Sequence, residues 1–170
     1  MKPAKVEIEK AIQSLLHPVG FKKKGTTWYL SSPEAVCVFK LDKSPYGQRY
    51  SVSLGVNAKQ LNAQSYPKVY DCHWYGNMTC TGPKGAEVIP VLELDTHSSG
   101  INRPPMSSIA SIRQFEVRSL DAFIDVARKE GLPFLLSLQT ADGIRRQWAA
   151  GRFRSFPLTG ALIHHLGLTS

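Results

Sequence analysis

The stretch that decides the fold is residues 20–57, GFKKKGTTWYLSSPEAVCVFKLDKSPYGQRYSVSLGVN. Three runs in it have the composition of β-strands: GFKKKGTTWYL (20–30), AVCVFKLDKS (35–44) and RYSVSLGVN (49–57). Aromatic and β-branched residues fill these runs, and Gly, Pro and Ser lie between them. We therefore expect three successive strands of an antiparallel sheet.

The third run alternates with the period of a strand that has one buried face. Its apolar positions are Tyr50, Val52, Leu54 and Val56, and the small polar positions between them are Ser51, Ser53, Gly55 and Asn57. The middle run is apolar at both parities, which predicts a central strand covered on both sides. We expect the small polar positions to form a shallow surface for a ligand or partner, unless residues 96–110 of the chain lie across it.

Helical periodicity precedes and follows these strands. Apolar residues recur at helical spacing over residues 4–16, and again in segments near 119–131, 140–148 and 158–166. Ser119 and Thr140 precede two of these segments and are expected N-caps, while Gly131 is expected to end the first and Pro133 to start a new turn. The pattern predicts an α+β fold: an antiparallel sheet of about five strands with an N-terminal helix and C-terminal helices packed on it.

A chain of 170 residues is long enough for one hydrophobic core, so we expect a single domain over residues 1–170. Short strands are expected within DCHWYGNMTC (71–80) and EVIPVLELD (87–95). Because of Pro90, the latter is expected either at a sheet edge or only past the proline. Residues 96–110 are rich in Ser, Gly and Pro and are expected to form a mobile loop.

Several features predict a soluble cytoplasmic protein. The longest apolar runs are far shorter than the ~20 residues that span a bilayer, and the charged start, MKPAKVEIEK, does not lead into a secretory signal. The three cysteines, Cys37, Cys72 and Cys80, are odd in number, and we expect reduced thiols. We therefore predict no membrane association.

Positive charge is concentrated at the start of the chain. The net charge is +8, and residues 1–68 hold 11 Lys and Arg against 4 Asp and Glu. Such an imbalance is compatible with nucleic acid or an acidic protein as a partner. The simpler interpretation of Lys22, Lys23 and Lys24 is a solvated turn.

The order of these segments resembles domain of unknown function family 4304, a bacterial family. The resemblance rests on GFKKKGTTWY, on the strand ending at Lys43-Ser44, on VSLGV (52–56), and on the later Cys72-His73 and GLPF (131–134). It implies bacterial origin and supplies no activity or catalytic residues. Trp74 departs from the pattern, in which a basic residue is expected after Cys72-His73.

Motifs for chemistry are not found. The sequence has no glycine-rich phosphate loop, dinucleotide fingerprint, nucleophile elbow or zincin pair. Cys72, His73, Cys80 and His97 are soft ligand types, but they lack the repeated close pairs of structural zinc sites. We therefore expect no catalytic residues, metal or cofactor.

The expected function is a non-catalytic module that binds a protein partner, of the immunity or accessory type. The alternatives are single-stranded nucleic-acid binding through the basic N-terminal region, where aromatic residues interleave with lysines, and an enzyme of unrecognised class. The sequence leaves the oligomeric state open. The candidate binding surface comprises Lys22, Lys23, Lys24, Trp28, Ser51, Ser53, Asn57, His73 and Trp74.

Overall fold

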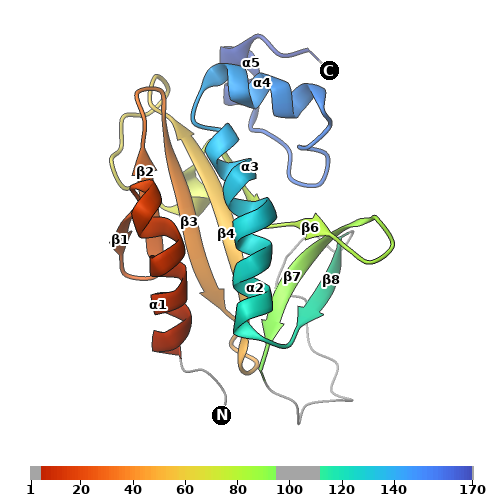
Figure 1. Cartoon of the computed structure of the whole chain (residues 1–170). Helices are drawn as coiled ribbons and strands as arrows, with labels where there is room; N and C mark the ends of the chain where they lie inside the picture. The colour runs from red at the N-terminus through yellow and green to blue at the C-terminus, as the bar shows by residue number, and fades with distance from the viewer. Residues whose placement is uncertain (1–4, 95–111, 170) are drawn as a thin grey trace.

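A computed structural model describes residues 5–94 and 112–169 and confirms the α+β fold (Figure 1). The expected loop at residues 96–110 lies outside the described residues. The helical segments are α1 (Lys5–Leu16), η1 (His17–Val19), η2 (Val69–Asp71), α2 (Leu120–Val126), η3 (Ala127–Gly131), α3 (Leu132–Ser137), α4 (Ala141–Ala149) and α5 (Gly160–Leu166). The strands are β1 (Lys22–Lys24), β2 (Thr27–Ser31), β3 (Ala35–Lys43), β4 (Arg49–Ala58), β5 (Trp74–Asn77), β6 (Cys80–Thr81), β7 (Glu87–Glu93) and β8 (Arg113–Val117).

The first four strands form an antiparallel meander, as the three runs predict. The first run, however, is a hairpin of two strands rather than one strand. Gly25 makes its turn with a φ of +66°, a left-handed conformation that glycine adopts at little cost. The three lysines therefore form a short edge strand, β1, and not the turn that we expected.

Beyond β4 the sheet branches, which raises its strand number to eight instead of about five. The strand β4 pairs with β5 through residues 53–56 and with β7 through Arg49 and Tyr50. The β7–β8 pair is parallel, which strand patterns alone did not predict. β7 contains Pro90 and pairs with β8 on one side and with β6 and β4 on the other, so the expectation of an edge strand or of a strand past the proline is wrong. Pro90 lies between the residues that pair with β6 and those that pair with β4, so no ladder on that edge needs its missing N–H.

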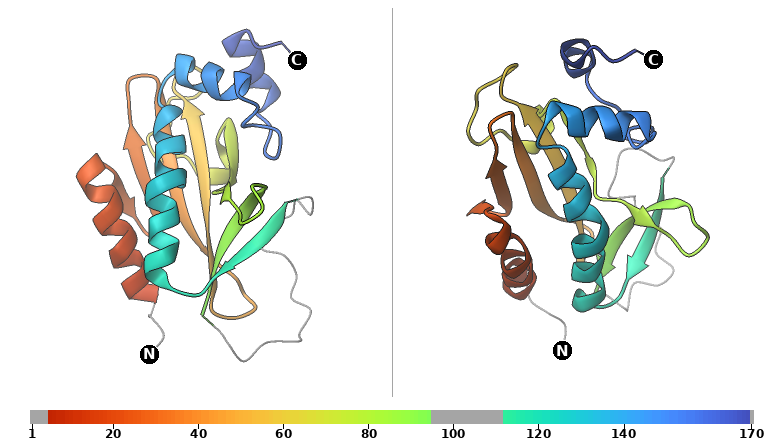
Figure 2. Two further views of the ribbon diagram at one scale, coloured as in Figure 1. Left: turned by 45° about the vertical axis from the view of Figure 1, so that its right-hand side comes forward. Right: turned by 45° about the horizontal axis from the view of Figure 1, so that its top comes forward.

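One face of the sheet, the helix face, carries the main core. Helix α1 and the α2–α3 helix lie side by side over it in both views of Figure 2. Ile8 and Ile12 of α1 and Phe123 of α2 are fully buried together with Phe39 and with the apolar parity of β4. The prediction that this parity faces the helices is confirmed.

The C-terminal region is helical, as predicted, but the helix does not end at Gly131. The helix passes from α2 through the π turn η3 into α3, and Gly131 has ordinary helical dihedral angles. The glycine is needed for space, because a Cβ there would lie 2.3 Å from Sδ of Met78. Pro133 follows at the start of α3, and the wider turn before it accommodates the loss of its N–H. Ser119 and Thr140 cap α2 and α4 as expected.

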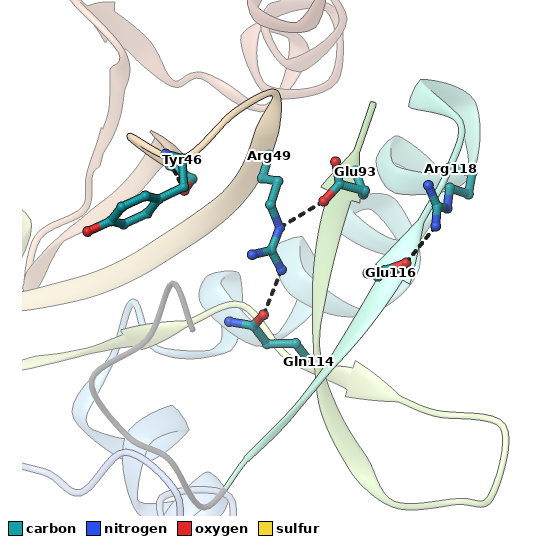
Figure 3. Close-up of polar contacts among 7 residues, drawn as sticks. Tyr46, Arg49, Glu93, Gln114, Glu116 and Arg118 are labelled. Atoms are coloured by element: carbon teal, nitrogen blue, oxygen red, sulfur yellow. Dashed lines mark hydrogen bonds and ion pairs between the residues drawn. The ribbon is translucent and has the colours of Figure 1, made fainter. Parts of the chain in front are cut away.

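A buried ion pair joins the branches of the sheet on the opposite side, which we call the outer face. The Arg49 guanidinium lies 2.9 Å from Oε2 of Glu93 on β7, and the two side chains are only 6% and 5% exposed. Its Nη2 also donates to Oε1 of Gln114 on β8, at 2.9 Å (Figure 3). One side chain of β4 thus connects three strands.

We predict that Arg49→Met lowers the free energy of unfolding by about 1.5–3 kcal/mol, because it removes the charged contacts of the buried guanidinium with Glu93 and Gln114. Arg118→Met is the matched control, since its ion pair with Glu116 is exposed and should be worth about 0–1 kcal/mol. Urea denaturation of both variants measures the difference. Equal losses would contradict a structural role for the buried pair.

Candidate partner-binding surface

The outer face is covered in part by residues 59–73, the irregular connection after β4. A second apolar cluster forms there from Val36 and Val38 of β3 with Val69 and Cys72 of the connection. Gly55 of β4 permits this contact, since a Cβ on it would lie 3.0 Å from Sγ of Cys72. The expectation that β3 is covered on both sides is confirmed.

Four tyrosines join this covering segment to the sheet in two edge-to-face pairs. The Tyr29 ring of β2 lies 5.2 Å from Tyr66, with an interplanar angle of 81°. The Tyr70 ring lies 5.6 Å from Tyr75 of β5, at 89°. Each pair therefore joins one residue of the sheet to one residue of the connection, in the geometry that the ring quadrupoles favour.

Lysines lie over these rings. Nζ of Lys24 is 4.2 Å from the centre of the Tyr66 ring, and Nζ of Lys40 is 5.1 Å from that of Tyr70. Lys22 lies directly opposite Tyr29 in the β1–β2 ladder and so shares its side of the sheet. We call this surface the tyrosine patch; it comprises Tyr29, Tyr66, Tyr70, Tyr75, Lys22, Lys24 and Lys40.

The tyrosine patch is open to solvent. Tyr66, Tyr70 and Tyr75 are 51%, 59% and 44% exposed. Exposed aromatic residues gathered in one place, with a polar surround, are typical of interaction sites. The outer face is therefore the best candidate surface of the described residues.

The three lysines of the predicted surface are divided between the two faces of the sheet. Lys22 and Lys24 are exposed and belong to the tyrosine patch. Lys23 points to the helix face, where its Nζ is 3.4 Å from Oε1 of Glu9 and 5.7 Å from the centre of the Trp28 ring. They do not form one cationic cluster.

Both tryptophans of the predicted surface are core residues, which corrects their inclusion. Trp28 is fully buried, and its Nε1 donates to Oε1 of Gln13 at 2.7 Å. Trp74 is buried and donates from Nε1 to the carbonyl of Phe156 at 2.7 Å. Because successive side chains of a strand point to opposite faces, Tyr75 points to the outer face while Trp74 points into the core.

The small polar positions of β4 are buried, so the shallow surface that we expected there is wrong. Ser53 donates to the Asp42 carboxylate, and the amide of Asn57 donates to the carbonyl of Asn62 at 2.7 Å. Ser51 is buried as well. The residues that we expected to lie across them, 96–110, are outside the described part of the chain; the described cover is the connection 59–73.

His73 is half-buried and makes hydrogen bonds with backbone groups of two other segments. Its Nδ1 accepts a hydrogen bond from the Ala58 N–H at 2.9 Å, and its carbonyl accepts one from the Thr159 N–H at 3.1 Å. Burial, with His165 nearby, lowers its pKa below 6.5. The residue thus joins the end of β4 to the start of α5.

The three cysteines of the described residues are buried and free. Burial raises the pKa of Cys37 and Cys72 to about 12 and that of Cys80 to about 11, so the three free thiols are protonated at neutral pH. Within residues 5–94 and 112–169 there is no group of three or more His, Cys, Asp or Glu side chains able to hold a metal ion. No helix in the described part is long and apolar enough to cross a bilayer.

The predicted surface contained only Lys22 and Lys24 of the tyrosine patch; it missed Lys40 and all four tyrosines, Tyr29, Tyr66, Tyr70 and Tyr75. Tyr66 and Tyr70 lie in a connection without periodicity, so nothing in the local pattern shows which way they point. One signal was present: Tyr29 pairs with Val38 and Val38 with Gly55 across adjacent strands, and the glycine, which has no side chain, leaves room on that side of the sheet for a covering segment.

Comparisons with known proteins agree with the resemblance described from the sequence. A family model described as Domain of unknown function (DUF4304) matches residues 12–99, a range that extends from α1 past β7 and contains the whole tyrosine patch. No curated protein and no solved structure matches the chain.

We predict that Gly55→Ala lowers the free energy of unfolding by about 1–3 kcal/mol, because the added methyl overpacks against Cys72 and Val69. Gly160→Ala is the control, since a Cβ at Gly160 has no atom within 4 Å. Chemical denaturation compares the two variants. A loss for Gly55→Ala no larger than that of the control would contradict the close approach of the connection.

Stability should also fall on acidification through His73. Its pKa is lower in the folded chain than in the unfolded one, so its contribution is complete above about pH 6.5 and is lost as the pH falls through the folded-state pKa. His73→Asn keeps an acceptor for the Ala58 N–H and cannot titrate. Its unfolding free energy should therefore change less than that of wild type between about pH 7 and about pH 5, and identical pH profiles would refute the assignment.

Proposed function

Since the chain belongs to the DUF4304 family, whose function is unknown, we propose a role from its structure: it is a non-catalytic module that binds a protein partner. The observation that carries the proposal is the tyrosine patch, with two tyrosine pairs and three lysines on one solvent-exposed face. Tyrosine suits a protein interface, because it offers a large rigid contact area at low entropic cost together with a hydroxyl.

The raised pKa values of the three buried thiols support a binding role over thiol catalysis. Free, reduced cysteines are also the usual state in a bacterial cytoplasm, which is where we place this immunity-type or accessory module.

A second candidate is single-stranded nucleic acid, because aromatic and cationic side chains share the patch. Bases bind such surfaces by stacking on open ring faces. Here Lys24 covers one face of Tyr66 and Lys40 covers one face of Tyr70, and the edge-to-face pairing occupies further ring surface. This arrangement favours a protein partner, which can contact ring edges, hydroxyls and ammonium groups without stacking.

The test is capture of a partner by variants of two equally exposed tyrosines. Tyr70 lies in the tyrosine patch and Tyr46 lies in the β3–β4 hairpin, and each is 59% exposed. Tagged wild-type protein is cross-linked in a nuclease-treated lysate of the cells that produce it. Tyr70→Ser should reduce capture of a discrete protein by about tenfold or more, as for a hot-spot residue, and Tyr46→Ser should leave it unchanged.

Two results would contradict the proposal. One is equal capture by both variants, which would remove the tyrosine patch from the interface. The other is a capture that occurs in an untreated lysate and is absent from the nuclease-treated one, which would favour the nucleic-acid alternative.

A further inference from the structure

The tyrosine patch has an uncompensated positive charge at its β1 end. Lys40 is engaged by Asp42, with 3.3 Å between Nζ and Oδ1. Lys22 and Lys24 make no ion pair with any residue of the described chain, and both are exposed. A partner that binds there meets two free ammonium groups beside two tyrosine rings.

We infer that the partner of the tyrosine patch presents an acidic segment, whose carboxylates bind Lys22 and Lys24 while its apolar groups contact Tyr29 and Tyr66. This inference rests on the proposed function and adds the chemical class of the partner. Charge complementarity is the physical reason, because opposite charges steer encounter and exclude basic partners. Lysine is the cation of all three basic positions in the patch, and it lacks the planar fork with which arginine recognises phosphate in two contacts.

The position of Lys24 over the Tyr66 ring favours a carboxylate over a nucleotide as the group bound there. The Lys24 ammonium lies over the Tyr66 ring, so a group that binds the ammonium from the solvent side reaches the ring edge rather than its face. A carboxylate with a short aliphatic stem fits that position. A nucleotide whose phosphate binds Lys24 would find one face of the neighbouring Tyr66 ring already covered by that ammonium group.

The β1 strand supplies its own control. Lys23 has the same charge and the neighbouring position, but it points to the helix face, toward Glu9 and Trp28. Neutralising Lys23 changes the net charge of the protein as much as neutralising Lys22 or Lys24. A difference in binding between these single variants therefore depends on the position of the lost charge and not on the net charge of the protein.

The experiment measures binding of poly-L-glutamate, with poly-L-lysine and single-stranded oligo-dT as competing probe classes. Wild type should bind poly-L-glutamate, and raising the salt from about 50 mM to about 300 mM should weaken that binding through screening. Lys22→Gln and Lys24→Gln should each weaken it about threefold as single variants, which match Lys23→Gln in lost charge, and about tenfold in combination. Lys23→Gln should change it less than about twofold.

Three outcomes would overturn the inference: no preference for poly-L-glutamate over poly-L-lysine, an equal loss in Lys23→Gln, or tighter binding of oligo-dT that depends on the same two lysines. The capture experiment with Tyr70→Ser distinguishes a failure of this inference from a failure of the proposed function. If the Lys22→Gln and Lys24→Gln variant still captures that partner, the acidic segment is wrong and the partner-binding role remains. If no capture depends on Tyr70, the partner-binding role is wrong whatever the probes show.

Discussion

The structure depends on the need to cover β3 on both sides. Cys37 and Phe39 point to the helix face, and Val36 and Val38 point the other way; all four are fully buried or nearly so. A helix layer satisfies the first pair. The second pair has no helix layer, and the irregular connection 59–73 takes that role with Val69 and Cys72. Because a connection offers few apolar side chains, it covers only part of the outer face, and its tyrosines remain at the border with solvent.

Much of the fold could be predicted because local signals and tertiary structure agree. The apolar parity of β4, the helical period of α1 and the caps Ser119 and Thr140 are all local, and all are confirmed. The wrong or missing predictions concern positions whose structure is determined by contacts with residues distant in the sequence. Gly131 has the sequence context of a helix end, but Met78, fifty residues earlier in the chain, occupies the space beside it. The parallel β7–β8 pair likewise depends on strand order, which no local period contains.

The candidate site was harder to predict than the fold, for a related reason. A surface is defined by which side chains are left outside, and composition does not distinguish Trp74, which is buried, from Tyr75, which is exposed. Strand parity makes that distinction, but only once the register is known. The lysines of β1 show the same limit, since alternation sends Lys23 away from Lys22 and Lys24. Charge concentrated along the sequence is thus divided in space.

Neighbouring residues of β5 contribute to two different parts of the structure. Tyr75 contributes to the solvent side, while Trp74, one step earlier, holds the carbonyl of Phe156 and so the segment that leads into α5. The four residues of this strand therefore contribute both to the outer face of the sheet and to the attachment of the C-terminal segment. A ligand that requires Tyr75 in place also requires the strand that anchors the C-terminal helices. A ligand bound through Tyr75 would therefore stabilise the docking of those helices, and their docking would in turn favour its binding.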